Sequence, residues 1–284
     1  MTPEYIVTGR INGTTKLGSP FCTLKLRNLE EELSVAVWDV APGEDPQMGH
    51  IVTFVIINNG DGRHTARKTD MVLHGMAEAS HPLYNLIPRP VERDKWDHTI
   101  HTLTQMCGDS ILCNLITEAA DKLYQPYSMY PAATSIHHAF PGGLLNHTYQ
   151  MLHMLEGIAP TLPYQTRIDY CVLGILFHDY GKTMTYKKSG EKNAQDFLLG
   201  HIYISAYSLH REMEKRNIDS HDIERVIHII LAHHGIKEYG SPVVPCTQEA
   251  ILVHMLDNLS AKTDTIDSSA DMEYVNTLGT TVVK

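Results

Sequence analysis

Short apolar runs separated by polar turns fill the first 88 residues and predict β-strands. The runs are rich in β-branched and aromatic residues, and several alternate apolar with polar positions, as half-buried strands do. Turn sequences such as Asn12-Gly13 separate them. The predicted strands cover residues 5–11, 21–27, 33–38 and 51–57, with a fifth over residues 65–74. About five short strands with glycine-rich turns favour a small all-β barrel, and an OB-fold is the best candidate.

From Trp96 onward, the apolar residues follow the period of an α-helix. Helices are predicted from Trp96 and over residues 111–119, 143–156, 166–178, 200–216, 220–233 and 248–262, with prolines and glycines between them. We therefore predict two domains, an N-terminal OB-like barrel over residues 1–88 and an all-α domain over residues 96–264. A proline-containing linker would join them at residues 89–95, and residues 265–284 would form a loosely held tail.

Composition narrows the class of protein. The formal net charge of −10 argues against general attraction to nucleic acid or to anionic membranes, although it leaves room for a local basic groove. The five cysteines are odd in number and lack CxxC spacing, which is typical of reduced thiols. The first residues lack the pattern of a signal peptide, and no apolar run reaches the roughly 18 residues that a membrane helix needs. We therefore expect a cytoplasmic protein with no membrane partner.

One stretch combines an apolar run with ionisable residues. Residues 170–177 predict a buried helix, which ends at His178-Asp179 and is followed by Gly181 and Lys182. A neutral imidazole beside a carboxylate is costly to bury unpaired, but the pair is well suited to bind a divalent metal. For this pair alone, a structural hydrogen bond at a helix end is the alternative.

Histidine is unusually common, and 12 of the 18 histidines lie from His137 onward. Several of them, with two aspartates, fall at helix ends or on apolar stripes: His147, His178, Asp179, His201, His233, His234 and Asp257. Five imidazoles and two carboxylates on the inner faces of successive helices are difficult to satisfy as ordinary core residues. Together they predict a dinuclear metal site.

The spacing His147 … His178-Asp179 … Asp257 resembles the H…HD…D signature of the HD-domain metal-dependent phosphohydrolases. The fuller motifs are similar to the YhaM family of 3′→5′ exoribonucleases, which have an N-terminal OB-fold and a C-terminal HD domain. These motifs are His137-His-Ala-Phe-Pro-Gly-Gly-Leu-Leu-Asn-His147-Thr, His178-Asp-Tyr-Gly-Lys182, Leu199-Gly-His201-Ile, His233-His-Gly and Leu256-Asp-Asn-Leu-Ser-Ala-Lys262. The resemblance covers nearly the whole chain, and Asn146 departs from it where related sequences usually carry Glu.

The resemblance implies two groups of metal ligands that share one carboxylate. One ion would be bound by His147, His178, Asp179 and Asp257, and the other by the shared Asp179, His201, His233 and His234. Mixed imidazole and carboxylate ligands favour Mn²⁺, with Fe²⁺, Co²⁺ or Ni²⁺ as alternatives, and suit Mg²⁺ least. Two such ions can hold a bridging hydroxide and polarise a phosphodiester.

Three further residues accompany this ligand set. Lys182 would neutralise a phosphate oxygen in the transition state, and an ordinary solvated lysine is the alternative. His138, in the loop before Gly142, would bind phosphate, protonate the leaving oxygen or simply cap the loop. His254 lies three residues before Asp257 on the same helix face, and we expect it to support a metal ligand.

By resemblance, the chain is expected to hydrolyse single-stranded RNA, or DNA, from the 3′ end and to release nucleoside monophosphates. Phe21, Trp38, Lys25 and Arg27 would let the barrel contact the strand, unless the two rings belong to the core. A monomer and a homo-oligomer are both compatible with the sequence.

Two other functions stay open. The first is an HD-type phosphohydrolase of cyclic dinucleotides or nucleotides, although the chain lacks the Gly-Tyr-Pro element of the HD-GYP enzymes. The second is a nucleic-acid-binding accessory protein with a structural metal site. Lys182 argues against it, because a structural site needs no phosphate-neutralising lysine.

Overall fold

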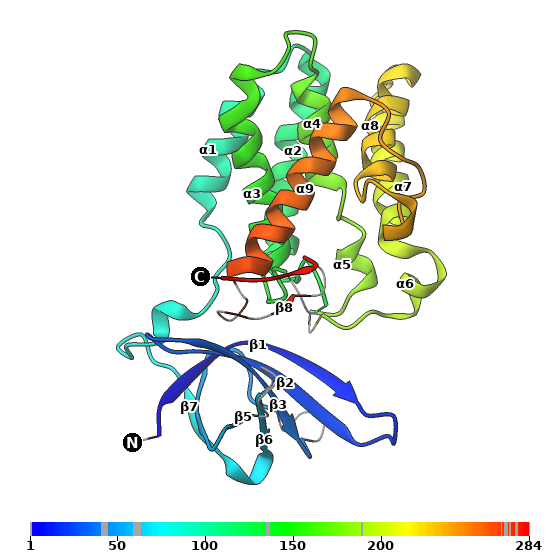
Figure 1. Cartoon of the computed structure of the whole chain (residues 1–284). Helices are drawn as coiled ribbons and strands as arrows, with labels where there is room; N and C mark the ends of the chain where they lie inside the picture. Colours follow the sequence, from blue (N-terminus) through cyan, green and yellow to red (C-terminus); the bar gives the residue numbers. More distant parts are fainter. Residues whose placement is uncertain are drawn as a thin grey trace. The chain divides into compact units, whose positions relative to one another are not determined.

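The structure is a computed structural model. It describes residues 2–40, 45–58, 64–134, 137–188, 190–267, 269, 272, 274–275 and 278–283. For residues 11 and 58 it describes the backbone alone. The chain divides into two compact units, Met1–Arg89 with Asp264–Lys284 and Pro90–Thr263. Figure 1 draws the strands of residues 4–76 in blue and cyan and most helices of the second unit in green to orange. The domain bounds given above, with the loosely held tail, remain predictions.

The first unit is built on one curled sheet, open like a half-barrel, with the strand order β5-β6-β3-β2-β1-β4-β7. Its strands are β1 Glu4–Thr14, β2 Pro20–Arg27, β3 Glu32–Trp38, β4 His50–Phe54, β5 Ile57–Asn58, β6 His64–Arg67 and β7 Met71–Met76. Only β3 and β6 pair in parallel among these neighbours. Leu24, Leu26, Val35 and Val37 alternate inward and are fully buried, so one face of the sheet carries the core of this unit.

Two of the predicted strands are wrong, because each corresponds to two separate strands in the structure. The predicted strand 51–57 is divided into β4 and β5, and the predicted strand 65–74 into β6 and β7. A 3₁₀ turn at Lys68–Asp70 separates β6, which pairs with β3, from β7, which pairs with β4 near the opposite end of the sheet. The polar run Arg67-Lys68-Thr69-Asp70 breaks the apolar alternation, because the chain leaves one part of the sheet there.

The second unit is helical, as predicted. Its helices are α1 Arg93–Thr104, α2 Ser110–Tyr127, α3 Gly143–Ile158, α4 Ile168–Phe177, α5 Lys182–Thr185, α6 Ala194–Leu198, α7 Gly200–Lys215, α8 Ser220–Ala232 and α9 Gln248–Asp267, which ends in the first unit. The sequence pattern missed α5 and α6, which are too short to show a period. Past α9, β8 Tyr274–Val275 and β9 Thr280–Thr281 pair antiparallel in a separate two-stranded sheet.

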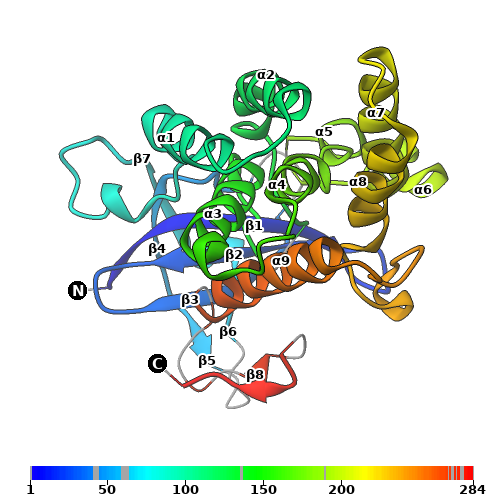
Figure 2. The ribbon, with the colours of Figure 1, turned by 90° about the horizontal axis from the view of Figure 1, so that it is seen from above.

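Helix α4 is the centre of the helical unit. All ten of its residues are buried, as expected for a helix that is apolar all round from Tyr170 onward. Seen from above in Figure 2, α2, α3 and α8 lie around it, and each of them contacts it. A helix in this position brings the residues at its C-terminal end into the middle of the unit, where several other helices can reach them.

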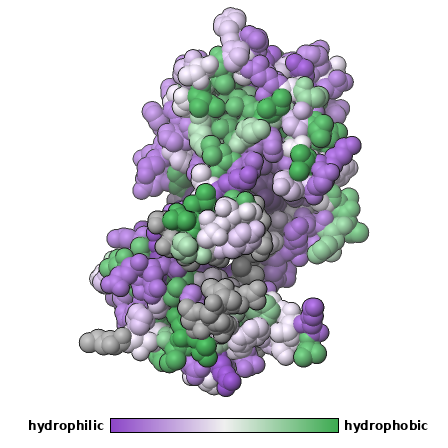
Figure 3. Space-filling model, in the orientation of Figure 1, coloured by the Kyte–Doolittle hydropathy of each residue, from purple (hydrophilic) through white to green (hydrophobic). Residues whose placement is uncertain are grey.

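Helix α9 has a buried side and an apolar outer side. Ala250, Val253 and Leu256 are buried, whereas Ile251, Met255 and Leu259 are about half exposed, at 46, 55 and 49%. On the face shown in Figure 3, hydrophobic residues gather over the part of the unit where α9 runs in Figure 1. In the described part of the chain, no helix combines the length and apolar character needed to cross a membrane.

Candidate metal centre

The pair predicted from the apolar run, His178 and Asp179, lies directly after α4 and is buried. The backbone N–H of Gly181 donates a hydrogen bond to Oγ of Ser205 on α7. A Cβ atom at position 181 would lie 2.2 Å from the carbonyl oxygen of His201, so this close approach requires glycine. Gly181 therefore lets α7 pack against the turn after α4, and it brings His201 to Asp179.

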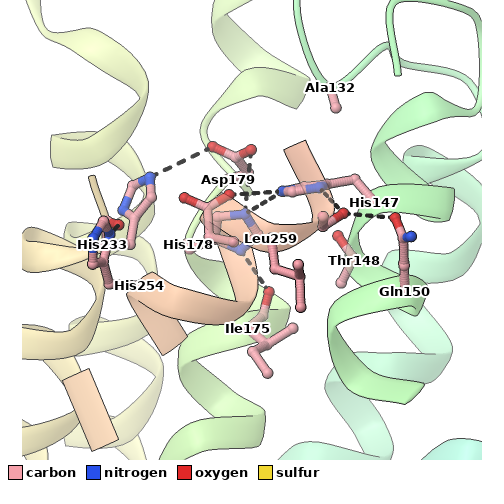
Figure 4. Close-up of polar contacts among 12 residues, drawn as sticks. Ala132, His147, Thr148, Gln150, Ile175, His178, Asp179, His233, His254 and Leu259 are labelled. Atoms are coloured by element: carbon pink, nitrogen blue, oxygen red, sulfur yellow. Dashed lines mark hydrogen bonds and ion pairs between the residues drawn. The ribbon is translucent and has the colours of Figure 1, made fainter. Parts of the chain in front are cut away.

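The first group of predicted ligands comes together from the first turns of α3, the C-terminal end of α4 and the middle of α9. Nε2 of His147 lies 3.2 Å from Nε2 of His178 and 3.1 Å from Oδ1 of Asp257. Oδ2 of Asp179 lies 3.3 Å from Nε2 of His178. Donor atoms that share one ion at about 2.1 Å are separated by roughly 3.0–3.4 Å, which is the spacing found here. Figure 4 shows these contacts between the rings and Asp179.

The second group meets the other oxygen of Asp179. Oδ1 lies 3.4 Å from Nε2 of His201 and 3.9 Å from Nε2 of His233. The ring of His234 lies 4.3 Å from that of His233 and 5.5 Å from that of His201, between centroids. Since the two carboxylate oxygens of Asp179 face two different histidine groups, this residue has the geometry of a bridging ligand.

Hydrogen bonds set the tautomer of four of these histidines. Nδ1 of His178, His233 and His234 faces the carbonyl oxygen of Ile175, Ile230 and Tyr239, at 2.8, 2.7 and 2.8 Å. A carbonyl oxygen can only accept, so each Nδ1 must carry the proton. Nδ1 of His147 lies 2.8 Å from Oγ of Ser260, which donates its own proton to Gln150 and therefore accepts from the ring. Each of the four Nε2 atoms is left with a lone pair, as metal ligation requires.

Three buried polar atoms at the centre lack a hydrogen-bond partner among the described residues: Oδ1 of Asp179, Nε2 of His201 and Nε2 of His233. Buried polar atoms are normally satisfied, so three unpaired polar atoms in one place, at least two of them acceptors, point to a bound cation. The protonation states of Asp179 and His233 agree with a bound cation. Burial opposes ionisation of Asp179, but the ammonium of Lys182 outweighs it and holds the pKa of Asp179 well below the usual range. Burial, and then the neighbouring His234, lowers the pKa of His233, so that ring is neutral. The donor set fits divalent transition metals.

The other predicted site residues occupy different places. Lys182 is buried, and its Nζ donates to Oδ2 of Asp179 and to the carbonyl oxygen of Ala132, each at 2.6 Å. Nδ1 of His254 donates to the carbonyl oxygen of His233 at 2.7 Å, so it contacts the backbone of a predicted ligand. Oδ1 of Asn146 accepts from the backbone N–H of Val91 at 2.7 Å, a contact outside the histidine groups.

The structure adds one histidine that the sequence analysis did not assign. His137 and His138 lie with His147 so that one nitrogen of each is within 4.8 Å of the others. His138 was a candidate phosphate-binding residue, and its position beside His147 is compatible with that role. His137 carried a usable signal, since it directly precedes His138 in the histidine-rich motif. Ser260 was also missed as the partner of His147.

Comparisons with known proteins agree with the geometry. The model of the HD domain family matches residues 144–262. The 3′-5′ exoribonuclease YhaM of Bacillus pumilus is 30% identical over 278 residues, covering 94% of this chain and 87% of its own. Its namesakes from Bacillus subtilis and Listeria innocua are both 29% identical, over 276 and 279 residues, covering 86 and 85% of their own chains. No solved structure matches the chain. These matches confirm the resemblance predicted from the motifs.

Proposed function

The chain belongs to the family of the YhaM 3′-5′ exoribonucleases, and we propose that it is a metal-dependent hydrolase that shortens single-stranded RNA from the 3′ end. The observation that carries this proposal is the position of Asp179. Its two oxygens face two separate histidine groups, and a carboxylate in that position can join two metal ions. The products would be nucleoside monophosphates.

We assign one ion to His147, His178, Asp179 and Asp257, and the other to Asp179, His201, His233 and His234. Two ions held there would polarise the scissile phosphodiester and lower the pKa of the attacking water. Imidazole-rich ligation favours Mn²⁺, with Fe²⁺, Co²⁺ and Ni²⁺ as alternatives. The residues themselves hold this arrangement, because Ser260 and three backbone carbonyls orient the rings.

Lys182 would contribute a fixed positive charge beside the reacting phosphate. Burial acts to lower its pKa, but Asp179 outweighs burial and raises it, so the ammonium stays charged. Because the lysine is buried and held by two hydrogen bonds, it needs no reorganisation as negative charge develops on the phosphate. His254 would act as a positioning residue by holding the carbonyl of His233.

The outward face of the N-terminal sheet would hold the RNA strand. Phe21 and Trp38 are paired across β2 and β3, with their rings 5.2 Å apart. Lys25 and Arg27 follow at alternate positions of β2, on the same face as Phe21, whereas Leu24 and Leu26 face the core. Aromatic rings beside cationic side chains are the combination that binds single strands without regard to sequence.

The experiment is hydrolysis of 5′-labelled single-stranded RNA by the purified protein with Mn²⁺, with single-stranded DNA and a cyclic dinucleotide as further substrates. We expect an RNA ladder that shortens from the 3′ end. Asp179→Asn should abolish hydrolysis and release both metals, whereas Asp94→Asn, an exposed aspartate on α1, should change neither. Cleavage of the cyclic dinucleotide alone, or early release of the 5′ label as a mononucleotide, would contradict the proposal.

A further inference from the structure

A pair of histidines outside the assigned ligand set faces the metal centre. His137 and His138 precede α3, and their rings lie 5.8 and 5.4 Å from that of His147, between centroids. One nitrogen of each of the three residues lies within 4.8 Å of the others. The pair therefore lines the side of the centre where His147 lies.

The backbone of this segment is connected to the catalytic lysine. The carbonyl of Ala132 accepts from Nζ of Lys182 at 2.6 Å, and the N–H of Ala132 donates to the carbonyl of His138 at 3.1 Å. His138 itself has a φ of +46°, which is uncommon for a residue other than glycine. A Cβ atom at Gly143 would lie only 1.9 Å from the His138 carbonyl oxygen. The strained backbone of His138 is thus held by the hydrogen bond from Ala132 and by close packing against Gly143. Such strain costs free energy and is concentrated at functional sites.

The three imidazoles do not make an independent metal site. His147 uses Nδ1 for Ser260, and its Nε2 lies beside His178 and Asp257. One ring nitrogen binds one ion, so only His137 and His138 remain available for a further ion. The group of three histidines also includes no carboxylate. Protein sites for divalent transition metals use three or four protein ligands. Two imidazoles are therefore better suited to an anion.

A bound oxyanion would accept the hydrogen bonds that these rings can donate. Nδ1 of His137 is buried and has no hydrogen-bond partner in the described part of the chain. An imidazole has an N–H donor in either protonation state, so it can donate to a phosphate oxygen whichever state it holds. Lys182, bound to the same segment through Ala132, provides positive charge nearby.

We propose that His137 and His138 form a phosphate-binding pair that donates hydrogen bonds to the non-bridging oxygens of the scissile phosphodiester, on the His147 side of the metal centre. The pair thus deepens the proposed ribonuclease function, on which it rests, by naming the residues that hold the reacting group of the RNA. Contact with the reacting phosphate would strengthen as its oxygens gain charge, so the pair would contribute to kcat as well as to KM.

The test compares His137→Leu, His137→Asn and, as a matched control, His210→Leu, which changes a half-exposed histidine on α7. We expect His137→Leu to retain both metals by elemental analysis and to lose about 10- to 100-fold in kcat/KM on RNA, the scale of one hydrogen bond to a charged group. Asparagine restores an N–H donor, so His137→Asn should recover most of the rate. His210→Leu should match the wild type. If His137→Leu does not fold, His137→Ala replaces it.

Calorimetric titration of the Mn²⁺-loaded protein with inorganic phosphate separates this inference from the proposed function, because it does not depend on turnover. A weaker phosphate affinity in His137→Leu, by about tenfold or more, supports the pair even if RNA is not the substrate. The inference is overturned if the variant loses a metal equivalent, since His137 would then be a ligand. It is also overturned if phosphate affinity and kcat/KM are both unchanged.

Discussion

Nζ of Lys182 lies 2.6 Å from Oδ2 of Asp179, the same oxygen that lies 3.3 Å from Nε2 of His178. The lysine follows the carboxylate by three residues, across the start of α5, so one short turn supplies both the proposed bridging carboxylate and a buried cation. A lysine placed there belongs to the charge balance of the centre, and it is not the solvated residue that the sequence left as an alternative.

Lys182→Ala should retain both metals and lower kcat by about 10²- to 10³-fold, the usual cost of removing one preorganised group that stabilises charge in the transition state. Steady-state kinetics on RNA and elemental analysis measure the two effects. Lys187→Ala, which changes an exposed lysine paired with Glu191, is the control and should behave as the wild type. A rate within a few-fold of the wild type would show that Lys182 has no catalytic role.

Ser260→Ala should weaken metal binding by about 10- to 100-fold, the usual effect of removing a hydrogen-bond partner of a metal-binding histidine. Without the hydroxyl, Nδ1 of His147 loses its acceptor, and the ring is free to take the wrong tautomer. Competition with a fluorescent chelator gives the dissociation constant. Thr263→Ala changes an exposed hydroxyl one turn further along α9 and should leave it unchanged. Equal affinities for the two variants would rule out an orienting role for Ser260.

How much of the fold and of the candidate site could be predicted from the sequence depends on how far apart in the chain the interacting residues lie. The helix before His178 was predictable because residues 170–177 form a local apolar run, and all of them are buried. That His147 and Asp257 meet was predictable because ionisable residues on apolar stripes are conspicuous. By contrast, Ser260 and His147 are 113 residues apart, and an ordinary serine gives no local signal of such a contact. The division of the fifth predicted strand also depended on distant partners, β3 and β4.

The sheet face provides a spectroscopic prediction. The chain has two tryptophans, of which Trp38 is 37% exposed and Trp96 is fully buried. If RNA stacks on the outward face, adding oligouridylate in the presence of EDTA should quench tryptophan emission, and Trp38→Phe should abolish this change. Phe21→Ala should weaken binding by about 5- to 100-fold, since stacking of one base contributes about 1–3 kcal/mol. Tyr164→Ala removes an exposed ring of the helical unit and serves as the control.

Unchanged affinity in Phe21→Ala, with no quenching of Trp38, would show that RNA does not bind this face. Hydrolysis of RNA would still be expected in that case, because the proposed metal ligands all belong to the helical unit. Measurements of RNA binding and of RNA hydrolysis together therefore distinguish a sheet that holds the RNA strand from a sheet with another role.

Alkaline pH should destabilise the sheet through Tyr5. The ring is buried, and its hydroxyl donates a hydrogen bond to Glu31. Burial first, and then the bond to Glu31, raises the pKa of Tyr5 above its ordinary value of about 10. A pKa that is raised in the folded state contributes stability that is complete below the unfolded pKa and is lost as the pH rises toward the folded pKa. The free energy of unfolding should therefore fall with increasing pH from about pH 10 upward.

Tyr5→Phe keeps the ring and removes the ionisable group. At pH 8 the variant should be less stable by about 1 kcal/mol, because it lacks the hydrogen bond to Glu31. Above pH 10 its stability should fall less steeply than that of the wild type, so the difference between the two proteins should shrink. Urea unfolding at a series of pH values, followed by the emission of Trp38 in the same sheet, measures both quantities. Parallel curves for the two proteins from pH 8 to 11 would mean that Tyr5 ionises equally easily in the folded and unfolded chains.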